Sequence, residues 1–122
     1  MQLARVLLSV QAMVYIATGI WAVFSRATFE KVTGPKTDYW LVRMVGLLVA
    51  VIGATLLTAQ SQTPIPASIW ILAIGSAIAF ATIDLRYALA KRISRIYLLD
   101  AAFEVLVAVA LGVAWWTSRS AA

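Results

Sequence analysis

The chain has 122 residues, of which 63% are hydrophobic and 12% are charged, whereas about a quarter of the residues of a soluble domain are charged. It contains no cysteine and no histidine, which excludes disulfides, thiolate nucleophiles and the commonest general base and metal ligand. The net charge of +5 comes from basic residues between apolar runs, a pattern that indicates membrane orientation and contact with membrane lipids rather than a nucleic-acid partner.

Four apolar stretches are each long enough to cross a membrane as a helix, which takes roughly 20 residues. They cover residues 3–24, 39–58, 66–85 and 96–117. The predicted fold class is therefore all-α: a polytopic membrane protein built as an antiparallel four-transmembrane-helix bundle. Because almost the whole chain is membrane span or short connection, a single domain is predicted over residues 1–122.

The connections differ in character. The first, residues 25–38, holds Phe29 and Val32 among charged residues, which predicts a short amphipathic helical turn at the membrane interface. The second, residues 60–64, has no charged residue, and the third contains Lys91, Arg92 and Arg95. Because the second link is so short, the second and third spans are predicted to be antiparallel neighbours.

Basic residues are distributed unevenly between the two sides of the predicted bundle. Only Arg5 and Arg119 lie on the side of the termini. The others lie in or beside the first and third connections: Arg26, Lys31, Lys36, Arg43, Arg86, Lys91, Arg92 and Arg95. Because short cytoplasmic loops carry the excess of Lys and Arg, both termini are predicted on the non-cytoplasmic side.

Aromatic and small residues add detail to the bundle. Trp70, Trp115 and Trp116 lie near the span ends on the side of the termini, as interfacial anchors do. Three sets of small residues recur at helical spacing and predict close helix packing. They are Gly46, Ala50 and Gly53; Ala73, Ala77 and Ala81; and Ala108 and Gly112. The same spacing is typical of dimer faces, so a homo-oligomer stays open.

The predicted spans contain Arg43, Asp84, Asp100 and Glu104, and a charge at the centre of a membrane helix costs on the order of a few kcal/mol. Such residues usually face the bundle interior and mark function. Asp100 and Glu104 are one helical turn apart and share a face. We predict a polar cluster that all four helices surround and that opens toward the cytoplasm. Its members are Arg43, Asp84, Tyr87, Asp100 and Glu104, with Gln11 and Tyr15 from the first span.

The cluster has a structural interpretation as well, in which Arg43 forms an ion pair with one of the carboxylates near the interface. Glu104 lies deeper, so that either Arg43 compensates its charge or Glu104 carries a proton or donates a hydrogen bond. Carboxylates can bind hard cations, but the spacing does not favour a metal over an ion pair. No metal site and no cofactor are predicted.

Two segments carry a resemblance to known proteins. The segment from Phe29 to Arg43, in particular Val-Thr-Gly-Pro-Lys-Thr-Asp at residues 32–38, and the segment from Tyr97 to Glu104 resemble a group of small bacterial four-helix membrane proteins without an assigned activity. In size and layout the chain is also similar to the DoxX-like small membrane proteins. The resemblance implies a location in the bacterial inner membrane and supplies no substrate, cofactor or catalytic residue.

Three functional hypotheses follow. The favoured one is a membrane binding protein or accessory subunit that receives a lipid headgroup, a small amphipathic ligand or a partner membrane protein, with Arg43 holding an anionic group. The alternative is a proton-coupled transporter that uses Glu104 and Asp100, although small multidrug exporters of similar size carry their key acid in the first helix. The third is a lipid-modifying enzyme with Tyr87 or Tyr97 assisting an acidic pair.

Overall fold

The computed structural model describes residues 2–121, and this part of the chain folds into five α-helices. They are α1 (Gln2–Phe24), α2 (Arg26–Thr33), α3 (Tyr39–Ala59), α4 (Ala67–Leu89) and α5 (Tyr97–Ala121). All except α2 are long and apolar enough to cross a membrane. The predicted all-α fold of a multi-pass membrane protein is thus confirmed. The domain predicted over residues 1–122 includes Met1 and Ala122, which lie outside the described residues.

The helix boundaries follow the predicted spans closely. The largest differences are at the ends of α4 and α5, which continue to Leu89 and Ala121. Hydropathy falls once polar residues begin, whereas the backbone hydrogen bonds of a helix continue beyond the apolar stretch. The predicted amphipathic turn is also confirmed as α2. This helix ends at Thr33 and is followed by Gly34 with φ of 97°, a conformation that glycine adopts without steric cost.

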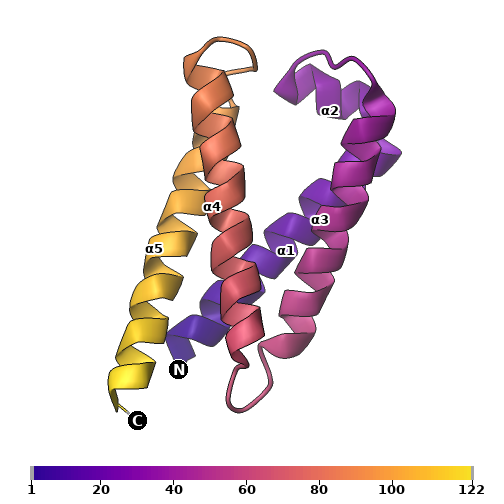
Figure 1. The fold of residues 1–122 in the computed structure, drawn as a ribbon. Helices are drawn as coiled ribbons and strands as arrows, with labels where there is room; N and C mark the ends of the chain where they lie inside the picture. Colours follow the sequence, from indigo (N-terminus) through magenta and orange to yellow (C-terminus); the bar gives the residue numbers. More distant parts are fainter. Residues whose placement is uncertain (1, 122) are drawn as a thin grey trace.

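The four long helices form two pairs. Helix α1 packs along α3, and α4 packs along α5, while contacts between the two pairs are much sparser. Figure 1 shows that both termini and the α3–α4 connection lie at one end of the molecule, with α2 and the α4–α5 connection at the other. The pairs lie close together near the termini and diverge toward the end that carries α2 (Figure 1).

Glycine residues set the close contact between α1 and α3. A Cβ atom added at Gly46 would lie 2.8 Å from the carbonyl oxygen of Gly19, and one added at Gly53 would lie 2.8 Å from that of Ala12. The two backbones therefore touch where larger side chains would separate them. The small-residue face predicted on the second span thus packs against the first span of the same chain.

The main apolar core joins the two pairs at the end near the termini. Leu8, Leu56 and Leu111 are fully buried there. Trp70 of α4 is only 2% exposed and its ring stacks on that of Trp115 of α5, with centroids 5.8 Å apart and planes 3° from parallel. The interpretation of Trp70 as an interfacial anchor was therefore wrong, because the neighbouring helix covers its ring.

Candidate functional site

A cavity of about 410 Å³ lies between the two helix pairs at the end that carries α2. All five helices contribute to its lining. Most of its walls are aliphatic or aromatic, with Tyr15 and Phe80 meeting edge to face at a centroid distance of 5.6 Å. The cavity lies where the two pairs diverge, because the apolar core that joins them is confined to the end near the termini.

Three carboxyl groups line one side of this cavity. Asp84 comes from α4 and is 5% exposed, whereas Glu104 comes from α5 and is 1% exposed. Asp100 lies one turn before Glu104 on the same helix and is half-buried. Asp84 and Asp100 face the same cavity from neighbouring helices. The structure thus brings together the three acidic residues that the sequence singled out.

Helix α1 supplies a hydrogen-bonded chain to these acids. The Tyr15 hydroxyl donates to Glu104 Oε2 at 2.7 Å, and the Gln11 amide donates to the Tyr15 hydroxyl at 3.2 Å and to the Ala73 carbonyl at 2.9 Å. Tyr15 lines the cavity, while Gln11 is fully buried behind it. These hydrogen bonds therefore connect α1 to both helices of the other pair across the interior.

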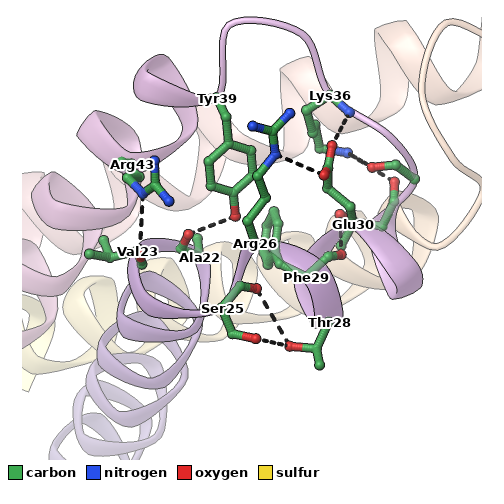
Figure 2. Close-up of polar contacts among 12 residues, drawn as sticks. Ala22, Val23, Ser25, Arg26, Thr28, Phe29, Glu30, Lys36, Tyr39 and Arg43 are labelled. Atoms are coloured by element: carbon green, nitrogen blue, oxygen red, sulfur yellow. Dashed lines mark hydrogen bonds and ion pairs between the residues drawn. The ribbon is translucent and has the colours of Figure 1, made fainter.

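Arg43 does not join this cluster. Its side chain is exposed, its Nε donates to the Val23 carbonyl at 3.2 Å, and its guanidinium carbon lies 4.9 Å from the centre of the Tyr39 ring. Figure 2 shows Arg43 directed at this carbonyl. The last carbonyls of a helix lack intrahelical donors and carry partial negative charge. The C-terminus of α1 therefore binds the guanidinium, and the predicted ion pair between Arg43 and a carboxylate is wrong.

Tyr87 also lies outside the cavity lining. It is half-buried on α4, and the guanidinium carbon of Arg86 lies 5.8 Å from its ring centre. Tyr97, by contrast, lines the cavity near the start of α5. Of the two tyrosines considered as assistants to the acids, only Tyr97 is beside the cavity.

Helix α2 and the segment after it cover the wide end of the cavity. Phe29 is buried and packs edge to face on Trp21 at a centroid distance of 5.0 Å. Lys36 Nζ donates to the carbonyls of Thr33 and Gly34, both at 3.0 Å, and lies 5.1 Å from the centre of the Tyr97 ring. Lys36, which the sequence suggested only as an orientation signal, is thus the one basic residue in the described lining.

Glu30 fixes the conformation of this cover (Figure 2). Its carboxylate accepts the backbone N–H of Lys36 at 2.6 Å and pairs with Arg26 Nε at 2.9 Å. These two hydrogen bonds, with that from Lys36 the stronger cause, hold the pKa of Glu30 below its ordinary value of 4.5. The deprotonated form is therefore the one that the folded segment favours.

This arrangement predicts acid-induced loosening of α2. Because the folded-state pKa is depressed, the contribution of Glu30 to stability is present above pH 4.5 and is lost as pH falls through the lower folded value. Amide hydrogen exchange across residues 26–36, corrected for intrinsic rates, should therefore accelerate between pH 5 and pH ~3. The variant Glu30→Gln should exchange rapidly at both values. Equal acceleration in both proteins would contradict this role.

Among the described residues, no group of three or more Asp or Glu side chains converges closely enough to hold a metal ion. The carboxyl groups instead border a space large enough for an organic molecule. No protein-family profile, curated protein or solved structure matches the chain, so function must be argued from this geometry.

Proposed function

We propose that this protein is a membrane-embedded binding protein that holds a small amphipathic molecule between its two helix pairs. The observation that carries the proposal is the cavity of about 410 Å³, with apolar walls and three carboxyl groups on one side. Small-molecule sites typically measure about 300–1,000 Å³ and combine apolar walls with a few polar groups. The apolar part of an amphipathic molecule can pack against such walls, and its polar part can bind the carboxyl groups.

The proposed setting is a bacterial inner membrane with the cavity near the cytoplasmic side. Two features support it: the resemblance of residues 29–43 and 97–104 to small bacterial membrane proteins, and the excess of basic residues at the α2 end. Among these, Lys31, Lys91 and Arg92 are exposed. Because cytoplasmic loops carry the basic excess and cytoplasmic leaflets carry anionic lipid, this end is expected to face inward.

Native mass spectrometry of the protein released from nanodiscs tests the proposal. Thr18 lines the cavity with an exposed side chain, so Thr18→Trp places an indole in the cavity without displacing the core. Ile20 lies two residues farther on α1, is exposed and lies outside the lining, so Ile20→Trp is the matched control. The wild type and Ile20→Trp should retain the same small molecule, and Thr18→Trp should lose it.

Two outcomes would contradict the proposal. If neither the wild type nor Ile20→Trp retains a discrete small molecule, the cavity does not hold a ligand. If Thr18→Trp retains the same species as the control, that species binds the outer surface of the helices. The same spectra report whether the protein is a homo-oligomer, because the mass of the assembly gives the number of subunits.

A further inference from the structure

The charges around the cavity are unbalanced. Its lining contains Asp84, Asp100 and Glu104 but only one basic residue, Lys36. Lys36 Nζ donates to two backbone carbonyls in the segment that covers the cavity. Among the described residues the only ion pair joins Arg26 to Glu30, outside this lining. Since Arg43 binds the end of α1, no basic side chain of this part of the chain pairs with the three acids.

The acids also differ in how the protein satisfies them. Glu104 accepts a hydrogen bond from the Tyr15 hydroxyl at 2.7 Å. Asp84 Oδ2, in contrast, is buried and has no hydrogen-bond partner, although the residue is only 5% exposed. A buried polar atom without a partner is uncommon and destabilises the folded protein. The protein therefore leaves the carboxylate of Asp84, a residue that lines the cavity, only partly hydrogen-bonded.

The position of Asp100 is a further reason to expect a positively charged donor at Asp84. It lines the same cavity as Asp84, and two carboxylates that face one cavity repel each other unless a proton or another cation lies with them. A donor group that also carries positive charge satisfies both acids at once. A neutral hydroxyl supplies a donor without the charge, and an anionic headgroup supplies neither.

The walls define the rest of the ligand. Around the acids the cavity is lined by aliphatic side chains, including Val14, Val45 and Val49, and by the rings of Tyr15 and Phe80. An apolar body packs against such walls, and the aromatic rings attract a cation through their electron-rich faces. A hydrated inorganic ion gains nothing from these walls, and the described acids do not form a metal-binding group.

We propose that the cavity takes a small organic cation, an ammonium group on an apolar body, whose N–H donates to the Asp84 carboxylate. The charge of the ligand is balanced by Asp84 and Asp100, and its body lies between α1, α3 and α4. This inference rests on the proposed function, since it names the chemical class of the ligand that the same cavity holds.

Three probes with the same aromatic body test the charge preference: the cation 1-naphthylmethylammonium, the neutral alcohol 1-naphthylmethanol and the anion naphthalene-1-acetate. Binding is measured by isothermal titration to the protein in phosphatidylcholine nanodiscs, with empty nanodiscs subtracted, so that lipid charge does not attract the cation. The wild type should bind the ammonium at least about tenfold more tightly than the alcohol, and the carboxylate least, because a hydrogen bond to a charged group stabilises by about 1.5–3 kcal/mol.

Asp84→Asn keeps the size of the side chain and removes its charge. Its affinity for the ammonium should fall at least about tenfold, while its affinity for the alcohol, which reports an intact cavity, should be unchanged. Asp38→Asn is the matched control, because Asp38 is an exposed acid outside the lining. It should bind all three probes as the wild type does.

The outcomes separate this inference from the proposed function. Equal wild-type affinities for the ammonium and the alcohol would overturn the inference, and this comparison needs no variant to fold. If the wild type binds the ammonium and the alcohol equally and Thr18→Trp binds neither, the cavity is a ligand site without a charge preference. Absence of binding by the ammonium would also overturn the inference, and retention of a small molecule in the mass spectra would then decide whether the cavity holds any ligand.

Discussion

Gly19→Val is expected to destabilise the protein by about 3 kcal/mol or more, in the upper part of the range for overpacking. A Cβ atom at Gly19 would overlap the Gly46 carbonyl oxygen and lie 3.0 Å from the Ala50 backbone nitrogen. These are backbone atoms of the facing helix, which cannot move aside as a flexible side chain can. The helices must separate along the α1–α3 contact. Equilibrium unfolding in mixed micelles of mild detergent and SDS measures the loss.

Gly112→Val is the matched control. Gly112 lies in the interior of α5, and a Cβ atom there would meet no atom of the described chain within 4 Å. Its effect should stay within about 0.5 kcal/mol, because only the small difference in intrinsic helix preference remains. Similar destabilisation by both variants would show that valine at any membrane-helix glycine is harmful, and would contradict the role of the α1–α3 contact.

Trp70→Ala is expected to destabilise the protein by about 3–5 kcal/mol, the range for removing a buried tryptophan from a core. The Trp70 ring lies in the core that joins the two helix pairs and stacks on Trp115. Its removal leaves a cavity where α4 meets the rest of the bundle. Equilibrium unfolding in mixed micelles, as for Gly19→Val, measures this change in the free energy of unfolding.

Trp116→Ala provides the comparison, since Trp116 is the next residue after Trp115 but is 74% exposed. Its removal should change the free energy of unfolding by no more than about 0.5 kcal/mol, as for most exposed positions. If Trp116→Ala were as harmful as Trp70→Ala, loss of an anchor at the membrane surface would explain both variants, and the stacked core would not.

The spans could be predicted from the sequence because a membrane imposes both a minimum length and an apolar composition on each helix. The pairing of the helices could not. Gly53 and Gly112 look alike in the sequence, yet a Cβ atom at Gly53 would meet α1 and one at Gly112 would meet nothing within 4 Å. The difference depends on how each helix is rotated about its axis, which the spacing of small residues leaves open.

The candidate site was predicted in part. Asp84, Asp100 and Glu104 were identified because charges inside membrane helices are costly, and the structure gathers them around one cavity with Tyr15. The depth of Arg43 and the side that it shares with Gly46 and Ala50 predict that it belongs to the same cluster. Nothing in the sequence reveals that the C-terminal carbonyls of α1 lie within its reach. The hypothesis of proton-coupled transport by Glu104 and Asp100 stays a prediction.

The division into two helix pairs has a consequence for how the protein is made. The pairs correspond to consecutive parts of the chain, α1 to α3 and then α4 to α5. The first pair can form its glycine contact and its bond from Tyr39 to the Ala22 carbonyl at 2.7 Å before the rest of the chain is synthesised. Tyr15 can form its hydrogen bond to Glu104 only after α5 has been inserted. The cavity, like the core between the pairs, can therefore be completed only after the second pair has been inserted.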